Sequence, residues 1–534
     1  MRNQSAGRWH SDHGKAVWVW SVILLVLVMV KILPAQELAT LPTNHWAYEY
    51  LQQLGLRQRL PGTMLLTLPF SYQQIAAMSD SAEPLAHSTA QQFWLQRLRA
   101  LTATPNALQP RIQAGWRIIE KTGRLNHENV RSRLAVRSHL GIFPDRHLAL
   151  FNVINMDQEL GDDPQYIGKR WRGFTGFSEQ AYALLHFDKY LVKFGRDFVW
   201  WGRGRDATLL ISDHSRPMDH LLAQLDWPRL RLTYLAARLD RMPLPDSLVA
   251  RYNVDFAERY LAAGRGEFEL VKNRLRLAVT QMVLHGGPHH NFEWYYLNPF
   301  IFYHGEQLNE KELSKNQGGN TLGVVDFVAR LRPRVEFYGQ LLVDDVQIEK
   351  TRRGDLEPNE IACLVGIEIA DPVSLDATTV GLEYTRVANR TYNTLVAWEK
   401  FLHRHRPIAH FLGNDFDRWL LHASMYAGAN VQLNFTTELL RRGEGRIDSV
   451  FDQSFKHYSL AQGYREKFPT GVVEKSWHLR LEARWHPRPG FFLSAHGQYS
   501  RYGNFAHRNG AHETDTGFFL RLWWEKDWLI PIGQ

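Results

Sequence analysis

The stretch Lys193–His220 holds the residues best suited to ligand chemistry in this sequence. It contains two adjacent tryptophans with three arginines close to them in the sequence: Trp200, Trp201, Arg196, Arg203 and Arg205. Flat aromatic faces beside guanidinium groups suit a ring-shaped, partly anionic ligand such as a sugar polymer. The same residues also fit an aromatic girdle followed by a turn, with the arginines fixing a loop. On residues alone, ligand binding and packing both remain open.

The pair Asp344-Asp345 is the best candidate for acid–base chemistry. A glycosidase needs two carboxylates that flank one bond from separate directions. Adjacent strand residues point to opposite faces, so this pair cannot supply both groups by itself. A structural charge followed by a strand-end turn is the alternative. We predict no catalytic residue, and place Asp344 with Arg196 in a secondary set of ligand contacts.

The other motifs that could carry chemistry do not have the residues or the spacing that a metal, phosphate or catalytic site requires. The segment His285–His290 carries three histidines around a Gly-Gly-Pro turn, which matches no closed zinc site and indicates a surface loop. The glycines of Gly202–Arg205 lack the Lys-Ser/Thr that completes a phosphate loop. No Gly-x-Ser-x-Gly nucleophile elbow is present. The sequence therefore predicts neither a metal nor a cofactor.

The amino-acid composition limits the classes of protein to which the chain can belong. Of 534 residues, 12% are aromatic and 44% hydrophobic, and the single cysteine, Cys363, excludes an intramolecular disulfide. A formal net charge of +8, with no basic tract or RNA-binding signature, does not indicate nucleic acid as a partner. High aromatic content with scattered hydrophobicity is typical of membrane β-strands. A soluble chain of this length usually splits into domains, and a closed barrel is the main exception.

Residues 1–35 are predicted to be a targeting segment. Arg2, Arg8 and Lys15 precede an almost wholly apolar run, Ala16–Val30, and cleavage is expected after Ala35. An uncleaved signal anchor is the alternative. Either way, the chain that follows is exported.

Residues 42–104 show helical spacing of their apolar positions. Trp46, Tyr50 and Leu54 fall on one stripe, and two further helices are predicted after Ser71 and from about Ser88. This spacing predicts a small helical subdomain of about three helices.

From Pro110 onward the apolar period changes to two. His478–Trp485 alternates without a fault, and all its polar positions are ionisable. This pattern fits a barrel whose apolar face meets lipid and whose charged face meets a wet lumen. At roughly 20–26 residues per strand and loop, residues 110–534 predict about 16–20 strands. The last strand is expected at Thr516–Trp524, and aromatic clusters at Trp294–Tyr296 and Phe300–Tyr303 are expected at strand ends.

An ordered set of segments carries a resemblance to a known family. The chain resembles the Wzi-type capsule assembly family of outer-membrane proteins from about Trp46 to Trp524. The segments are His45–Tyr48, Lys193–Arg196, Trp201-Gly202, Leu209–Ser212, Tyr296–Phe300, Phe337–Asp345 and His410–Asp415. Arg203 departs from the pattern, because family members often have a proline there.

The resemblance implies a mainly β fold: a large antiparallel transmembrane barrel of about 16–18 strands with a small N-terminal helical bundle, residues 42–104, on its periplasmic side. It implies an outer-membrane protein that anchors capsular polysaccharide or exopolysaccharide at the cell surface, and it does not imply an enzyme. We expect a monomer whose partners are this polysaccharide and outer-membrane lipid. Trp200, Trp201, Arg203 and Arg205 would then contact the polymer. An outer-membrane channel is the alternative function, and a barrel hydrolase is a third.

Overall fold

The computed structural model describes residues 39–58, 60, 67–82, 88–102, 109–123, 128–145, 147–162, 166, 168–305, 318–348, 351–488 and 490–527. The predicted signal segment, residues 1–35, lies outside this described part of the chain. Among the described residues, no helix is both long and apolar enough to cross a membrane.

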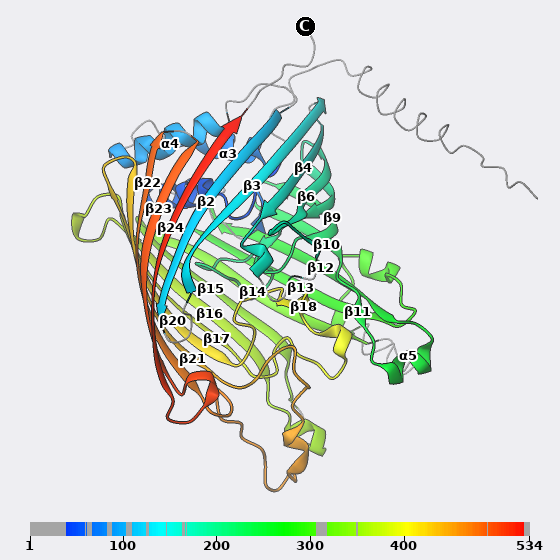
Figure 1. The fold of residues 1–534 in the computed structure, drawn as a ribbon. Helices are drawn as coiled ribbons and strands as arrows, with labels where there is room; N and C mark the ends of the chain where they lie inside the picture. Colours follow the sequence, from blue (N-terminus) through cyan, green and yellow to red (C-terminus); the bar gives the residue numbers. More distant parts are fainter. Residues whose placement is uncertain are drawn as a thin grey trace, which may run out of the picture.

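Eighteen long antiparallel strands close into a barrel within the described residues, which confirms the predicted fold class (Figure 1). They are β2 (Gln109–Gly123), β3 (Glu128–Asp145), β4 (Leu148–Asp157), β6 (Phe174–Phe187), β7 (Tyr190–Asp197), β9 (Met218–Trp227), β10 (Leu230–Arg238), β12 (Phe256–Val271), β13 (Leu275–Gly287), β14 (Gly319–Arg332), β15 (Val335–Asp345), β16 (Glu360–Ala370), β17 (Thr378–Val387), β20 (Phe416–Ala427), β21 (Val431–Arg442), β22 (Glu474–Arg488), β23 (Phe491–Gly503) and β24 (His512–Asp527). Strand β24 pairs with β2 and closes the sheet, with Arg521 opposite Arg117.

Shorter elements sit on and inside this wall. The two-residue strands are β1 (Thr67–Leu68), β5 (Arg170–Trp171), β8 (Trp200–Trp201), β11 (Met242–Pro243), β18 (Leu402–His403) and β19 (Arg406–Pro407). The α-helices are α2 (Trp46–Gln58), α3 (Tyr72–Asp80), α4 (Thr89–Thr102) and α5 (Asp246–Tyr252). The 3-10 helices are η1 (Leu160–Asp162), η2 (Trp294–Leu297), η3 (Arg353–Leu356), η4 (Pro372–Ser374), η5 (Ala397–Glu399), η6 (Ser454–His457) and η7 (Phe505–His507).

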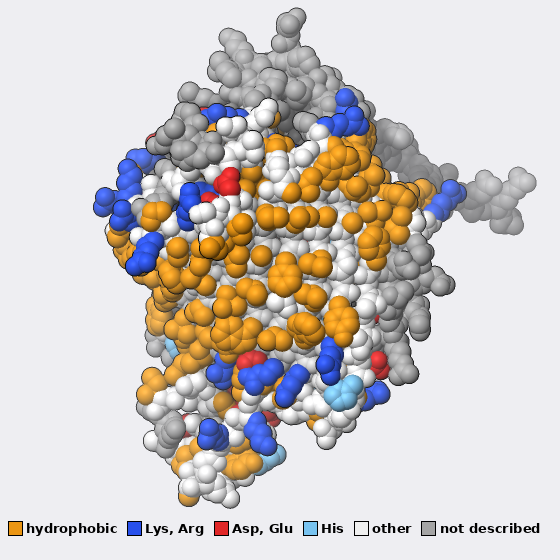
Figure 2. Space-filling model, turned by 90° about the vertical axis from the view of Figure 1, so that its left-hand side faces the viewer, with side chains coloured by type: hydrophobic (Ala, Val, Ile, Leu, Met, Phe, Trp, Pro, Cys, Tyr) orange, Lys and Arg blue, Asp and Glu red, His pale blue; other side chains and the backbone are white. Residues whose placement is uncertain are grey.

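The strands are inside out compared with those of a soluble protein. In β20, Trp419 faces outward and is 49% exposed, whereas its neighbour Arg418 faces the lumen and is 3% exposed. The outer face carries a broad band of apolar side chains, with charged residues gathered toward its edges (Figure 2). This is the surface that the hydrocarbon of a bilayer requires of a barrel.

The two ends of the barrel differ. Helices α3 and α4 lie at one end, and the strand connections there are short, such as residues 188–189 and 228–229 (Figure 1). Long connections, such as 239–255, 388–415 and 443–473, leave the opposite end. We call these the helical end and the loop end.

The helical segment forms as predicted from its periodicity. Ser71 caps α3 through a capping box with Gln74, which satisfies free backbone N–H groups at the start of the helix. Ile75 and Met78 are the buried apolar residues of this helix. In α4, Trp94, Leu95 and Leu98 face inward, whereas Phe93 and Leu101 are only partly buried.

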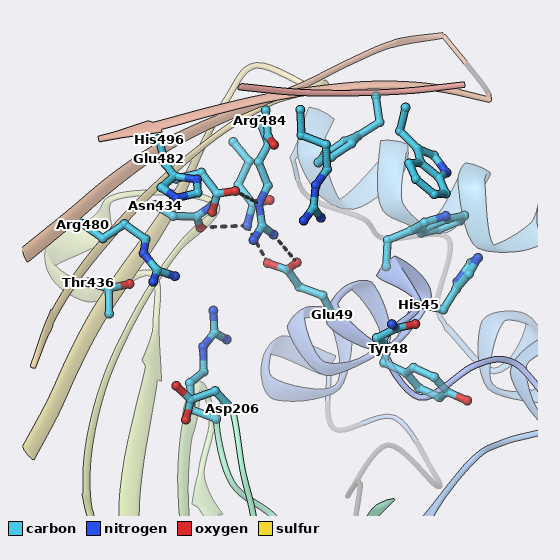
Figure 3. A pocket seen from close by; sticks show the side chains of 18 of the residues that line it. His45, Tyr48, Glu49, Asp206, Asn434, Thr436, Arg480, Glu482, Arg484 and His496 are labelled. Atoms are coloured by element: carbon cyan, nitrogen blue, oxygen red, sulfur yellow. Dashed lines mark hydrogen bonds and ion pairs between the residues drawn. The ribbon is translucent and has the colours of Figure 1, made fainter. Parts of the chain in front are cut away.

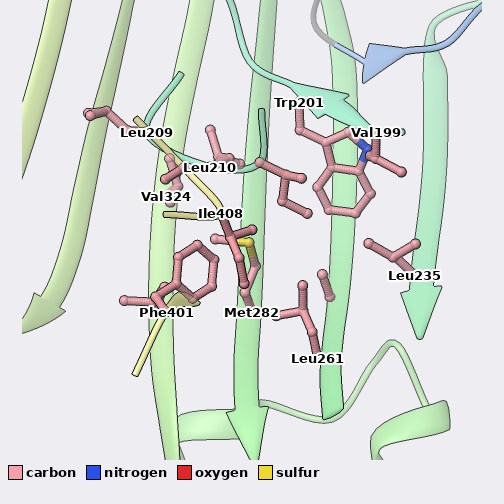
Figure 4. Packing of buried hydrophobic residues seen from close by; sticks show 14 of the residues in the cluster. Val199, Trp201, Leu209, Leu210, Leu235, Leu261, Met282, Val324, Phe401 and Ile408 are labelled. Carbon is pink, nitrogen blue, oxygen red and sulfur yellow. The ribbon is translucent and has the colours of Figure 1, made fainter. Parts of the chain in front are cut away.

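Two long loops fill one side of the lumen. Residues 198–217 and 388–415 pack Trp201, Leu209, Leu210, Phe401 and Ile408 against the inner face of the wall (Figure 4). Lumen-facing residues of β12 and β14, such as Arg265 and Asp326, are consequently buried. On the other side, the lumen-facing Arg480 of β22 and Arg521 of β24 are exposed to solvent. The lumen is therefore packed on one side and wet on the other.

Candidate functional site

A cavity of about 900 Å³ occupies the wet side of the lumen. Helix α2 forms one of its sides, and strands β20 to β24, β2 and β3 form the facing wall. Asn434, Arg480, Glu482 and His496 project from the wall opposite Glu49 of the helix (Figure 3). The alternation predicted for His478–Trp485 explains this, because every second residue of a strand faces the lumen.

Strand pairing lines up arginines across this wall. Arg484 of β22 pairs with Ser494 of β23, and Ser494 pairs in turn with Arg521 of β24. Arg521 then pairs with Arg117 of β2. Three guanidinium groups thus share one row across four neighbouring strands. Arg480 lies one lumen-facing position away from Glu482 on the same strand as Arg484.

Some cavity arginines are paired and others are not. Arg484 contacts Glu49 at 3.2 Å and Glu482 at 2.9 Å, and Arg117 pairs with Asp157 at 3.7 Å. Arg205, Arg480 and Arg521 also line the cavity, and none of them forms an ion pair with a described residue. The cavity therefore presents positive charge that a soluble anion can neutralise.

Aromatic rings lie in the same cavity. His496 and Phe519 stack with their ring centres 4.3 Å apart, and the Arg137 guanidinium lies 5.6 Å from the centre of the Trp523 ring. Trp200 also lines the cavity and donates from Nε1 to the Gly202 carbonyl at 2.9 Å. Rings beside guanidinium groups can take both the apolar face and the acidic substituents of a sugar.

The four main predicted ligand residues divide between cavity and interior. Trp200 and Arg205 line the cavity, and the Arg205 backbone N–H donates to Glu383 at 2.9 Å. Trp201 is fully buried in the core between the loops and the wall (Figure 4). Arg203 reaches the cavity edge, but its guanidinium is nearly buried between Glu336 at 3.0 Å and Glu368 at 2.8 Å.

Residues Trp200 and Trp201 also hold the helical segment in place. They form strand β8, which pairs antiparallel with β1: Leu68 lies opposite Trp200 and Thr67 opposite Trp201. The Thr67 hydroxyl is hydrogen-bonded to Glu267 on the barrel wall, and Arg265 donates to that hydroxyl at 2.9 Å. The tryptophan pair is thus a junction between the helical segment, a lumen loop and the wall.

Arg196 lies in a different place. It forms a bidentate pair with Asp219, at 2.7 and 2.6 Å, in a cleft of about 310 Å³ at the loop end. Asp240 lines the same cleft, where burial alone would raise its pKa, but a hydrogen bond with His403 and the charge of Arg259 lower the pKa to about 2. Arg196 therefore does not join the other predicted residues.

Asp344 is also outside the cavity. It accepts a hydrogen bond at 2.6 Å from the backbone N–H of Tyr392, in the loop that fills the lumen. The histidine segment was predicted to be a surface loop, but His285 lies in β13 and is buried, with its Nδ1 3.1 Å from Nε2 of His290. In the part of the chain that the structure describes, no cluster of histidine, cysteine and carboxylate side chains could hold a metal ion.

Several cavity residues were not among the predicted ligand contacts. They are Arg117, Arg137, Arg480, Arg484, Arg521, Phe519 and Trp523. The signal was present in the alternation of β22 and β24, which places charged and aromatic residues on one face. The sequence does not show the strand pairing and register that bring β22, β23 and β24 together with β2 in one wall.

Comparisons with known proteins agree with this architecture. A family model described as capsule assembly protein Wzi matches residues 119–517. The structure of Wzi from Escherichia coli, described as a carbohydrate-binding β-barrel involved in group 1 capsule assembly, is 18% identical. That likeness covers 92% of this chain and 100% of the Wzi chain, with a TM-score of 0.62.

More distant barrels also match. OprD from Pseudomonas aeruginosa is 9% identical over 80% of this chain and 97% of its own, with a TM-score of 0.43. No curated protein sequence matches the chain.

Proposed function

We propose that this chain, which belongs to the Wzi capsule assembly family, binds capsular polysaccharide through its barrel and holds it at the cell surface. The chain is an outer-membrane β-barrel of a capsule-assembly family, and the polymer contact is the proposed step. In this proposal the polymer is held without being cleaved, because the facing cavity carboxylates Glu49 and Glu482 are both ion-paired with Arg484, whereas a glycosidase needs two carboxyl groups free to act on one bond.

One observation carries the proposal. Arg205, Arg480 and Arg521 line a cavity that also holds aromatic rings, and none forms an ion pair with a described residue. A polysaccharide with carboxylate or other acidic substituents supplies the missing counter-charge, and its sugar rings can stack on Trp200 or Phe519.

Orientation supports the same function. In membrane barrels, short turns face the periplasm and long loops face outward. The helical end therefore faces the periplasm and the loop end faces the exterior, where a retained polymer must emerge. The cleft that holds Arg196 would provide a second contact for the polymer at this end.

The test is glycan binding by the purified barrel. Arg480→Gln and Arg521→Gln each remove one charge-assisted contact, which is worth about 1.5–3 kcal/mol, so each should weaken binding of an acidic capsular polysaccharide roughly 10- to 100-fold. Arg501→Gln, an exposed arginine of β23 outside the cavity, is the matched control and should bind normally. Unchanged binding in both cavity variants would contradict the proposal.

A channel is the second candidate, and the wet side of the lumen favours it. The exposed lumen faces of β22 and β24 leave space that the loops do not fill. Single-channel recording in planar bilayers separates the two functions. A steady open conductance would favour the channel, and a near-zero conductance would favour the binding barrel.

A further inference from the structure

The connection after β13 folds back over the outer wall of the barrel. Tyr296 and Tyr303 pack on Ala262 of β12 and Val283 of β13, and all four are buried. These two strand residues face outward, because their neighbours Leu261 and Met282 belong to the core inside the lumen. Part of the outer surface therefore has a second layer of protein, which we call the outer flap and define as residues 293–304.

Polar groups on the outward face of the wall bind the flap backbone. Tyr234 donates from its hydroxyl to the Tyr296 carbonyl at 2.7 Å. Gln281 donates from Nε2 to the Ile301 carbonyl at 2.7 Å, and its Oε1 accepts from the Tyr303 N–H at 3.2 Å. Irregular backbone is tolerated at membrane depth only where such partners replace water. The flap thus explains why a glutamine stands on the apolar outer face.

The wall is recessed where the flap reaches deepest. A side chain at Gly264 would place its first carbon 3.5 Å from the Pro299 carbonyl oxygen. Gly264 pairs with Gln281 in the middle of β12 and β13. The tip of the flap therefore lies well down the wall and away from the loop-end rim.

Three large apolar side chains of the flap point away from the protein. Trp294 is 80% exposed, Phe300 is 83% exposed and Phe302 is 67% exposed. Outward-facing Val279 of β13 and Val325 of β14 continue the exposed apolar surface beside them. Because this surface is continuous with the lipid-facing wall of an outer-membrane barrel, we propose that the outer flap is embedded among acyl chains of the outer leaflet, with Trp294, Phe300 and Phe302 in contact with lipid.

A cysteine-labelling experiment tests this placement. Cys363 is the only cysteine, so a Cys363→Ala background accepts one probe at a chosen site. The Phe300→Cys variant is labelled at its new cysteine with a small environment-sensitive fluorophore and reconstituted into phosphatidylcholine vesicles. Val279→Cys on the wall is the lipid-facing control, and Val450→Cys in the exposed loop after β21 is the water-facing control.

The probe at Phe300 should match the probe at Val279. Acyl-chain nitroxide lipids should quench both, and aqueous iodide should quench only the probe at Val450. Gln281→Ala, which removes the flap's hydrogen bonds, should move the Phe300 probe toward the aqueous pattern. Quenching by iodide in the parent background would overturn the proposal. Protection from both quenchers would also overturn it, because a second copy would then cover the flap.

Discussion

The Glu49 carboxylate of helix α2 lies 3.2 Å from the Arg484 guanidinium of strand β22, inside the barrel (Figure 3). At the other end of the same helix, Arg57 contacts Asp371 at 2.8 Å, with both side chains nearly buried. Gln52 donates to Glu368 at 2.6 Å between these two points. The helical segment is therefore fastened to the lumen wall along the length of α2.

Loss of the Arg57 contact should release the helices from the wall. Arg57→Ala leaves the buried Asp371 with only the half-exposed Arg334, at 3.5 Å, so the expected cost is about 3 kcal/mol. Limited proteolysis should then cleave the helical segment faster while the barrel remains resistant. Arg99→Ala, at an exposed position in the last turn of α4, is the control and should leave the cleavage rate unchanged.

The two tryptophans of β8 should respond differently to truncation. Trp201→Ala opens a cavity in the core and should destabilise the lumen loops by about 3–5 kcal/mol. Trp200→Ala should change thermal stability less and weaken binding of the polysaccharide. Thermal unfolding and glycan binding of both variants check this, and equal loss of stability in the two would show that Trp200 is only a packing residue.

Polysaccharide binding should weaken as salt concentration rises. Added ions screen the attraction between exposed arginines and an acidic polymer, since the Debye length falls from about 10 Å at 0.1 M to about 3 Å at 1 M. The double variant Arg480→Gln/Arg521→Gln should show a shallower salt dependence than the parent. Binding titrations at several salt concentrations measure this, and identical slopes would place the polymer elsewhere.

The loop end should lose stability as pH rises toward neutral. Burial, together with the charge of Asp345, raises the pKa of Glu357 from 4.5 to about 7. Between these two values the folded state holds a proton that the unfolded state has released, so stability falls as pH rises from about 4.5 to about 7. Unfolding temperatures at pH 5, 6, 7 and 8 measure the effect.

Glu357→Gln should flatten that pH profile, because its amide does not titrate. Asp376→Asn, in an exposed turn at the helical end, removes a carboxylate far from this loop and should leave the profile as in the parent. A profile that keeps its slope in Glu357→Gln would assign the titration to another group.

The sequence alone determined the barrel and the character of its lumen. The alternation over His478–Trp485 placed Arg480 and Arg484 on one face, because side chains alternate along any strand. An apolar outer face then required lipid, and the expected outer-membrane localisation agrees with the family to which the chain belongs. The last strand is longer than predicted, His512–Asp527, but Arg521 and Trp523 face the lumen together as expected from the same period.

The tertiary structure alone decided which residues form the cavity and which are buried. Trp200 and Trp201 are the same residue type in adjacent positions, and only the fold shows that Trp201 packs in the core between the loops and the wall while Trp200 lines the cavity. The Arg203 charge is matched by Glu336 and Glu368, more than 130 residues away, and no local pattern reports such contacts.

The positions of the aromatic clusters Trp294–Tyr296 and Phe300–Tyr303 also could not be predicted from local sequence. They were predicted at strand ends, and this was wrong: they lie in η2 and the connection that follows it, against the outer wall. Their composition fits either place, because both are apolar. Hydrogen bonds with Tyr234 and Gln281 fix the choice, and those partners come from strands that only folding brings together.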